Sequence, residues 1–298
     1  MKKLKLIYNP MAGNKEFPNR LDQCIKKLQA GNYQVSVFRS AQPGDLSLGL
    51  TDLSSDYDAV VVAGGDGSIN KIINALLARN LDIPLGIIPA GTANDFAHQL
   101  NIPSTLEEAV DVILEEKIET VDIGRVNGDY FINVCAAGLL ANVSHQIDIN
   151  LKNTLGKLGY YIKGIEQLPK FKNIPLKINT PQQMIEEEFY LFLILNGQGA
   201  GGFKQLAPQG KISDGVFDFI GVKACPLPQI ASLFVKILQG RHLEDQNIIY
   251  FQASQFKIEI TNDRLDNYHS DLDGEKGPEF PLHIEVVPKK LQVFTGYN

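Results

Sequence analysis

Two apolar runs in the first third of the chain each lead into a polar turn that contains glycine. Residues 59–63 read AVVVA and are followed by GGDGS, and residues 85–88 read LGII and are followed by PAGTAND. A continuous β-branched run is typical of a strand that is buried on both faces, as in a parallel sheet. Apolar residues then recur with helical spacing from Ile69 to Leu77. The pattern therefore predicts that the first turn joins a buried strand to a helix.

Strands and helices alternate on both sides of this stretch, up to about residue 120. The spacing predicts strands at residues 4–8 and 33–38, and helices over residues 21–31, after residue 44, and over residues 104–116. Ser104 and Glu107 have the spacing of a capping box at the start of the last of these helices. The alternation predicts a doubly wound α/β domain with a parallel sheet, which we place at residues 1–120.

The pattern changes after Ile118, where strands follow one another. Asn127-Gly128 separates strands expected at residues 120–126 and 129–134, and this dipeptide is typical of a tight hairpin. Further strands are expected at residues 176–179, 188–195, 215–222, 256–261 and 282–287, and helices at residues 153–167 and 228–238. We therefore expect a mostly antiparallel, β-rich second domain over residues 121–287.

Composition narrows the class of protein. The chain has 298 residues, of which 44% are hydrophobic and 21% are charged, so it is long enough for two globular domains. Its net charge of −6 argues against a nucleic-acid partner, which usually binds a basic protein. The three cysteines form no C-x-x-C pair, which favours reduced thiols in a cytosolic protein. The N-terminal apolar stretch is too short for a signal peptide, and no run reaches the length of a membrane-spanning helix.

The turn at residues 64–68 lies where open α/β sheets bind their ligands. Its glycines let backbone N–H groups approach an anion, and the helix start that follows adds a positive dipole. A phosphate group is therefore the expected ligand. Asp66 has two interpretations here: it handles a Mg²⁺-bound nucleotide, or it caps the helix that follows.

The two turns together resemble the catalytic domain of diacylglycerol kinases, in particular the bacterial soluble lipid kinases of that family. The resemblance rests on GGDGSIN at residues 64–70 and PAGTANDFA at residues 89–97. NAD kinases and phosphofructokinases share the first element, whereas the second separates the lipid kinases from them. The resemblance implies ATP and Mg²⁺ as cofactors, and a C-terminal stretch, residues 288–298, that returns to the first domain. The implied nucleotide-binding residues are Asn9, Pro10, Gly13, Ser40, Gly64, Gly65, Asp66, Gly67, Ser68, Asn70, Gly91, Thr92 and Asn94.

Several of these residues also have a purely structural interpretation. Asn9 and Pro10 can form an ordinary strand-to-helix turn. Thr92 and Asn94 can cap the helix that follows them. The assignment of Ser40 to the nucleotide site depends only on the resemblance, because the family often has a hydroxyl residue at this point of the chain.

Two clusters in the second domain contain the remaining candidate residues. KISDG at residues 211–215 follows a glycine-rich stretch, and SDLDGEKG occupies residues 270–277. Acidic side chains beside turn glycines suit a hard cation with oxygen ligands. Asp271 and Asp273 can equally belong to a solvated turn between two strands.

The first cluster resembles a metal-binding segment of the lipid kinases, with Ser213 in place of one acid. The resemblance makes Asp214 a metal ligand, and the backbone carbonyls of Lys211 and Val216 would complete a cation site with it. Asp95, together with Asp66 and Asp214, would form a water-bridged Mg²⁺ network.

The second cluster resembles the segment that supplies the general base in the family. Either Glu275 or Asp273 would take the proton from the lipid hydroxyl, and Asp66 would act beside the phosphates. This division of roles suits phosphoryl transfer, in which the protein mainly positions the reactants and neutralises charge.

These observations and the resemblance predict an ATP- and Mg²⁺-dependent lipid kinase that converts diacylglycerol to phosphatidic acid. We expect a cytoplasmic protein that meets its lipid peripherally, at the inner face of the membrane, and the sequence leaves open whether it forms a homodimer. The stretch from Lys152 to Lys177, rich in lysine and aromatic residues, either docks on an anionic membrane or forms a solvated helix face. Alternative functions are phosphorylation of another lipid (a sphingoid base or phosphatidylglycerol), of NAD or of a sugar, and nucleotide binding without catalysis.

Overall fold

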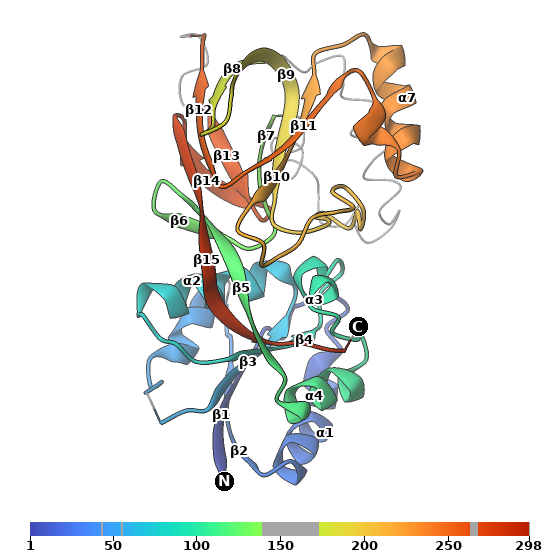
Figure 1. Ribbon diagram of the computed structural model, residues 1–298. Helices are drawn as coiled ribbons and strands as arrows, with labels where there is room; N and C mark the ends of the chain where they lie inside the picture. The colour runs from blue at the N-terminus through green and yellow to red at the C-terminus, as the bar shows by residue number, and fades with distance from the viewer. Residues whose placement is uncertain (43, 55, 139–172, 263–267, 298) are drawn as a thin grey trace. The chain divides into compact units, whose positions relative to one another are not determined.

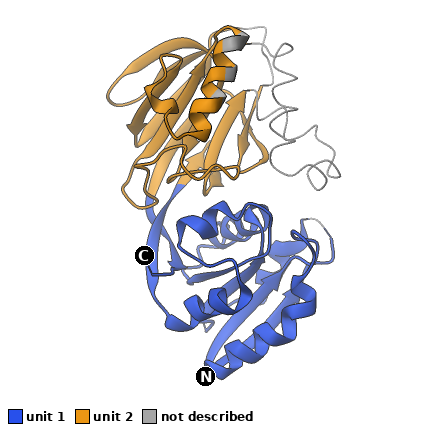
Figure 2. Cartoon of the chain, turned by 90° about the vertical axis from the view of Figure 1, so that its right-hand side faces the viewer, with its two compact units in different colours: residues 1–123, 288–298 blue, residues 124–287 orange. Residues whose placement is uncertain are grey.

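The computed structural model describes residues 1–42, 44–54, 56–138, 173–262 and 268–297. Two compact units make up the chain: residues 1–123 with 288–298, and residues 124–287 (Figure 2). The chain passes between them within β5 (Ile118–Val126) and β15 (Leu282–Phe294). The helix expected at residues 153–167, and most of the lysine-rich stretch, lie outside the described residues.

The first unit is an α/β structure built on a parallel sheet, as the sequence pattern predicts. Its strands lie in the order β4-β3-β1-β2, and the end of β15 pairs in parallel with β4. Helix α1 packs beside α4 on one face of this sheet, and α2 packs beside the 3₁₀ helix η1 on the other (Figure 1). The elements are β1 (Lys2–Tyr8), α1 (Phe17–Ala30), β2 (Tyr33–Arg39), η1 (Asp45–Leu50), β3 (Ala59–Gly64), α2 (Asp66–Ala78), β4 (Leu85–Pro89), α3 (Asp95–Gln99) and α4 (Leu106–Glu115).

Strand β3 lies at the centre of this unit, and all of its residues are buried. Its uninterrupted apolar sequence fits a strand that has helices on both sides. Helix α2 continues from it and buries one stripe of its surface, formed by Ile69, Ile72, Ile73, Leu76 and Leu77. Because β3 ends at Gly64 and α2 begins at Asp66, the turn predicted at residues 64–68 is reduced to Gly65, which lies between two well-packed elements.

The capping box of α4 lies one residue later than the sequence analysis places it. Thr105, not Ser104, is the N-cap, and its hydroxyl accepts a hydrogen bond from the Glu108 N–H at 3.4 Å. The backbone explains the shift, because Thr105 has the extended conformation that an N-cap residue adopts.

The second unit is a mostly antiparallel β structure, which confirms the predicted fold class. One path of neighbouring strands is β14-β13-β7-β9-β8-β12-β15, and β10 pairs with both β9 and β11. The strand expected at residues 129–134 ends earlier, as β6, and strands β7, β11, β13 and β14 are not anticipated from the sequence. The elements are β6 (Asp129–Phe131), β7 (Val134–Gly138), β8 (Ile174–Asn179), β9 (Met184–Leu195), β10 (Phe217–Lys223), α7 (Leu227–Leu238), η3 (His242–Glu244), β11 (Ile248–Ala253), β12 (Gln255–Ile260), β13 (His269–Leu272) and β14 (Glu275–Glu279).

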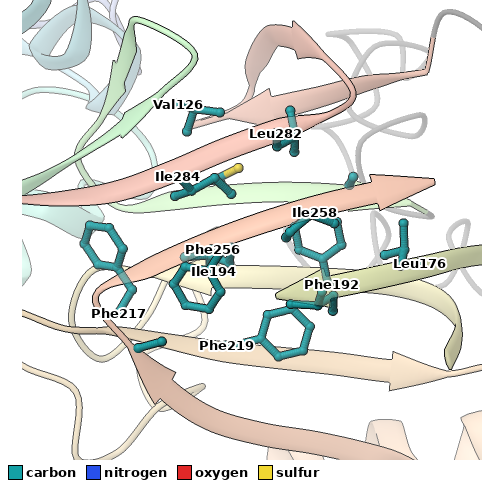
Figure 3. Packing of buried hydrophobic residues seen from close by; sticks show 14 of the residues in the cluster. Val126, Leu176, Phe192, Ile194, Phe217, Phe219, Phe256, Ile258, Leu282 and Ile284 are labelled. Carbon is teal, nitrogen blue, oxygen red and sulfur yellow. The ribbon is translucent and has the colours of Figure 1, made fainter. Parts of the chain in front are cut away.

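Phenylalanine side chains dominate the core of this unit (Figure 3). Phe219 of β10 stacks on Phe251 of β11, with ring centroids 4.7 Å apart, and also lies 5.9 Å from Phe192 of β9. Val126 of β5 and Ile284 of β15 join the same cluster. Buried aromatic side chains from several strands therefore stabilise the sheet of the second unit, and the loops of this unit extend from that sheet.

Two tight hairpins have both central residues in the left-handed region. Asn127 and Gly128 have φ values of 50° and 108°, and this turn confirms the hairpin expected from the dipeptide. Asp273 and Gly274 have φ values of 53° and 87° and join β13 to β14 in the same way.

The three cysteine thiols are buried, and we expect them to be unreactive in the native protein. Burial raises the pKa of Cys24 to about 12, and it also raises the pKa values of Cys135 and Cys225. Because the thiolate is the reactive form, a thiol-specific disulfide reagent at about pH 8 should release colour only after unfolding in guanidinium. Rapid reaction of one thiol in the folded protein would contradict this packing.

Candidate active site

The turns that follow β3 and β4 lie backbone against backbone. A Cβ atom added to Gly65 would lie 3.0 Å from the Gly91 Cα, and one added to Gly91 would clash with the Gly65 Cα. The Ala90 N–H donates a hydrogen bond to the Gly64 carbonyl oxygen at 2.9 Å, just beside this contact. Neither turn has room for a side chain at these positions, so the two glycines are required by the close approach.

Asp66 joins the two turns through its side chain. Its Oδ1 atom accepts a hydrogen bond from the backbone N–H of Phe96 at 3.0 Å, in the first turn of α3. Helix α2, which begins at Asp66, has Gly65 as its N-cap and no side-chain capping bond. The interpretation of Asp66 as a cap of its own helix is therefore wrong, because the carboxylate caps the neighbouring one.

Asn94 closes the second turn on itself. Its Oδ1 accepts a hydrogen bond from the Gly91 N–H at 2.9 Å, and its Nδ2 donates to the Gly91 carbonyl oxygen at 3.0 Å. Asn94 has a φ of 53° and no side-chain capping bond to α3. Capping of that helix by the Asn94 side chain is thus excluded, while Thr92 lies exposed in the same turn.

A third loop, after β1, reaches the same place. The Asn9 Nδ2 donates to the Ser68 hydroxyl at 3.2 Å, and the Asn9 Oδ1 accepts from the Met11 N–H at 2.9 Å. A Cβ on Gly13, whose φ is 49°, would clash with the Ala90 carbonyl oxygen. The carboxyl ends of β1, β3 and β4, which are neighbours in the sheet, therefore bring their loops together.

The remaining nucleotide candidates differ in how directly they meet these loops. Ser40 is buried directly after β2, where its N–H donates to the Tyr8 carbonyl oxygen at 3.0 Å. Pro10 is buried in the loop after β1, and Gly67 and Asn70 lie on the first turns of α2. Backbone without side chains, next to an uncapped helix start, fits the phosphates of a nucleotide.

Asp273 has a structural role in the second unit that the sequence does not reveal. Its Oδ2 accepts from the Ile132 N–H at 2.7 Å, and its Oδ1 accepts from the N–H groups of Asn133 and Val134 at 2.9 and 2.8 Å. The carboxylate therefore holds the β13–β14 hairpin against the start of β7. Glu275 lies exposed at the first position of β14.

The segment around Asp214 forms an exposed turn. The Val216 N–H donates to the Asp214 Oδ1 at 3.3 Å, and Gly215 has a φ of 80°. Both Lys211 and Asp214 are exposed. Within the described ranges, no group of three or more His, Cys, Asp and Glu side chains is arranged to hold a metal ion. Since Asp95 and Asp214 belong to different units, the water-bridged network stays a prediction.

Asp218 is a buried carboxyl group that sequence reasoning missed. It accepts hydrogen bonds from the Tyr250 hydroxyl at 2.6 Å and from the Gln252 Nε2 at 3.0 Å, all at Oδ1. Burial is the main cause that raises the pKa of Asp218, and the nearby charge of Asp214 adds to it. The sequence does contain a signal for this burial, because Asp218 lies within the apolar strand sequence VFDF at residues 216–219.

The chain joins a parallel α/β unit that carries converging glycine turns to an antiparallel β unit. Residues 3–126 match the family model described as "Diacylglycerol kinase catalytic domain". Residues 133–295 match the model described as "YegS C-terminal NAD kinase beta sandwich-like domain". The chain belongs to the diacylglycerol kinase family, and it is a lipid kinase by that membership.

Individual relatives match along almost the whole chain. The chain is 34% identical to the diacylglycerol kinase of Bacillus subtilis, over 97% of each sequence, and 35% identical to that of Staphylococcus haemolyticus, over 98% of this chain and 87% of the relative. A crystal structure of a diacylglycerol kinase from Bacillus anthracis superimposes with a TM-score of 0.82 at 27% identity, over 99% and 97% of the two chains.

We expect Gly91→Ala to separate the two turns. The added methyl group would clash with the Gly65 backbone and lie 2.7 Å from the Asn94 Oδ1, so the turns must shift. Overpacking of this kind costs about 1–3 kcal/mol, and we expect at least about tenfold weaker binding of Mg·ATP in calorimetric titration. Ala93→Ser, an exposed change in the same turn, is the control and should bind as the wild type does. Unchanged affinity in Gly91→Ala would show that the contact is dispensable.

We expect Asp273→Asn to lower the free energy of unfolding by about 1–3 kcal/mol. An amide group in place of one oxygen would set a donor against a backbone N–H, which leaves both unsatisfied. Asn tolerates the left-handed backbone, so the turn itself is preserved. Urea denaturation measures the change, with the exposed Glu275→Gln as the matched control that stays within about 0.5 kcal/mol. A stable but inactive Asp273→Asn would instead assign the base to Asp273.

Proposed function

We propose that this protein is an ATP- and Mg²⁺-dependent kinase that phosphorylates the hydroxyl group of diacylglycerol and forms phosphatidic acid. The contact between Gly65 and Gly91 supports the nucleotide part of this proposal, because it places two glycine turns at one edge of the sheet. Membership of the diacylglycerol kinase family, and the printed names of its relatives, support the lipid part.

The nucleotide phosphates bind to the backbone of the converging loops. Gly65, Gly67 and Gly91 permit close approach, and the start of α2 contributes its positive dipole. Asn9 orients the Ser68 hydroxyl beside them. Hydrogen bonds hold these groups in place without the ligand, which favours a small loss of conformational freedom on binding.

Carboxylate groups would hold the metal ion in this proposal. Asp66 keeps one oxygen on the Phe96 N–H, so its other oxygen is the one available to a metal-bound water. Asp95 and Asp214 would be the other carboxylates of this set, and the backbone carbonyls of Lys211 and Val216 would hold a second, structural cation together with Asp214. When bound, Mg²⁺ neutralises charge on the phosphate oxygens.

Glu275 is the proposed general base. Both oxygens of Asp273 already accept backbone hydrogen bonds, so Asp273 holds the hairpin and Glu275 is left to take the proton from the lipid hydroxyl. The clamp by Asp273 fixes the strand on which Glu275 lies. Proton removal from the attacking oxygen then accompanies its bond to the γ-phosphorus, while the bond from the γ-phosphorus to the β–γ bridging oxygen breaks and ADP leaves.

The lipid is reached by peripheral contact at the inner face of the membrane. Among the described residues, no helix is long and apolar enough to cross a bilayer. The hydroxyl of diacylglycerol lies at the interface between water and lipid, so a surface contact is sufficient to reach it.

Phosphate transfer from labelled Mg·ATP to a lipid panel in mixed micelles tests this proposal. The panel contains diacylglycerol, monoacylglycerol, ceramide, sphingosine and phosphatidylglycerol, and NAD and sugars form a second set. We expect labelled phosphatidic acid as the main product. Labelled phosphate in another lipid, in NAD or in a sugar would show that this molecule, and not diacylglycerol, is the substrate. Binding of ATP without any phosphate transfer would favour a non-catalytic nucleotide-binding protein.

We expect Glu275→Gln to lower kcat for the lipid by about 10²–10⁴-fold, because the amide cannot accept the proton. The KM for ATP and the free energy of unfolding should stay as in the wild type, since Glu275 is exposed and lies in the second unit. Glu279→Gln, also exposed on β14, is the matched control and should remain active. Full activity of Glu275→Gln would remove Glu275 from the mechanism.

A further inference from the structure

Along β15, the alternating buried residues have even numbers near the start of the strand and odd numbers from residue 291 to residue 293. Leu282 and Ile284 are buried near its start, whereas Leu291 and Val293 are buried near its end. Neighbouring residues of a regular strand point to opposite faces, so an odd shift means that the strand is interrupted. Lys289 is the point of interruption, because it has a φ of 50°.

The left-handed conformation of Lys289 is held in place by a buried carboxylate. The Asp122 Oδ1 accepts the Lys289 N–H at 2.7 Å, and Asp122 is only 1% exposed. A lysine in the left-handed conformation costs more free energy than a glycine would. Contacts with the surrounding structure must therefore hold Lys289 in this conformation. The result is that two consecutive residues, Lys289 and Lys290, line the same cleft.

This cleft belongs entirely to the first unit. It has a volume of about 260 Å³, and its lining consists of Leu77, Asn80, Leu81, Asp82, Thr120, Lys289, Lys290 and Gln292. It lies at the C-terminal end of α2, whereas the converging glycine turns lie at the N-terminal end of the same helix. The cleft is therefore separate from the candidate active site.

The side chains that line the cleft carry more positive than negative charge. Within the ranges that the structure describes, neither lysine ammonium has a hydrogen-bond or ion-pair partner, and both side chains are exposed. The single carboxylate in the lining, Asp82, already accepts a hydrogen bond from the Gln292 Nε2 at 2.9 Å. Within the lining, two lysine charges therefore face one carboxylate, whose partner Gln292 belongs to the same lining, and the buried Asp122 carboxylate lies at the backbone of Lys289.

The end of α2 does not need the lysines as caps. The Leu76 carbonyl oxygen accepts from the N–H groups of Arg79 and Leu81 at 3.2 and 3.1 Å, and the Leu77 carbonyl oxygen accepts from Asn80 at 3.0 Å. The helix dipole still attracts a nearby cation, but that attraction does not require a strained strand that brings two lysines to one side.

We propose that this cleft binds a phosphoryl anion, either a free phosphate ester or the phosphodiester of an anionic lipid headgroup. Lysine recognises phosphate as a point charge, and Thr120 and Asn80 supply polar groups beside it. The volume decides the size of the ligand. Drug-sized ligands and cofactors fill about 300–1,000 Å³, so the enclosed part of this cleft is of a size for a phosphate group with a small substituent.

Calorimetric titration with inorganic phosphate and with glycerol phosphate at constant ionic strength tests the proposal. We expect Lys289→Gln with Lys290→Gln to raise the Kd about 30-fold, at about 1 kcal/mol for each lysine. Lys26→Gln with Lys223→Gln removes the same charge elsewhere and should leave the Kd unchanged. Phosphate bound at the glycine turns is common to both proteins, so the difference between them reports the cleft.

Asp82→Asn provides a test that misfolding cannot imitate. It removes the opposing negative charge and keeps an oxygen for Gln292, so we expect phosphate to bind about fivefold more tightly. Equal phosphate affinity in the wild type, the lysine double variant and Asp82→Asn would overturn the proposal, and the lysines would then serve only the end of α2.

Vesicle sedimentation separates the two sources of the phosphoryl group. If the ligand is a lipid headgroup, the lysine double variant should bind phosphatidylglycerol vesicles more weakly than the Lys26/Lys223 control, with no difference on phosphatidylcholine. If only the soluble phosphates discriminate between the variants, the ligand is a free phosphate ester. Both results support the cleft as a phosphoryl site, and each names its source.

Discussion

The approach of two backbones at Gly65 and Gly91 is the constraint on which the candidate site depends. The strands β3 and β4 are parallel neighbours, so their carboxyl ends meet at one edge of the sheet. Only residues without a Cβ atom allow the following turns to touch there. The hydrogen bonds from the Phe96 N–H to Asp66 and from the Ala90 N–H to the Gly64 carbonyl oxygen then hold the two turns together. The packing leaves bare backbone at this edge of the sheet, and the proposed phosphate site uses that backbone in place of a lysine-containing P-loop.

Several acidic side chains in this protein accept hydrogen bonds from backbone N–H groups and so have a structural role. Asp66 accepts from Phe96, Asp273 accepts from three consecutive N–H groups, and Asp122 accepts from Lys289. Each carboxylate satisfies donors of a turn or strand that lies far away in the sequence. The presence of an acidic residue in a motif is therefore a weak guide to catalysis until its hydrogen bonds are known.

The sequence predicts the strands and helices that depend on local pattern. The apolar run of β3, the stripe of α2 and the Asn127-Gly128 hairpin are all present. Strands β13 and β14 escaped prediction because they are short and contain charged residues, glycine and proline instead of an alternating apolar pattern. Pairing across the sheet stabilises them, and that pairing is not a local property.

The candidate site divides in the same way. Glycine turns and their phosphate chemistry follow from local sequence and from resemblance to the family. The roles of Asp66 and Asp273 do not, because their partners lie 30 and about 140 residues away along the chain. Asp218 was missed because burial of a carboxyl group depends on the strands that cover it, including the unpredicted β11.

A crystal structure of the protein with a non-hydrolysable ATP analogue and Mg²⁺ would test the central claim most directly. The packing of the glycine turns predicts that the phosphates lie against the backbone N–H groups of residues 65–68 and 91–94. A nucleotide bound in any other place, with these turns facing only solvent, would contradict it.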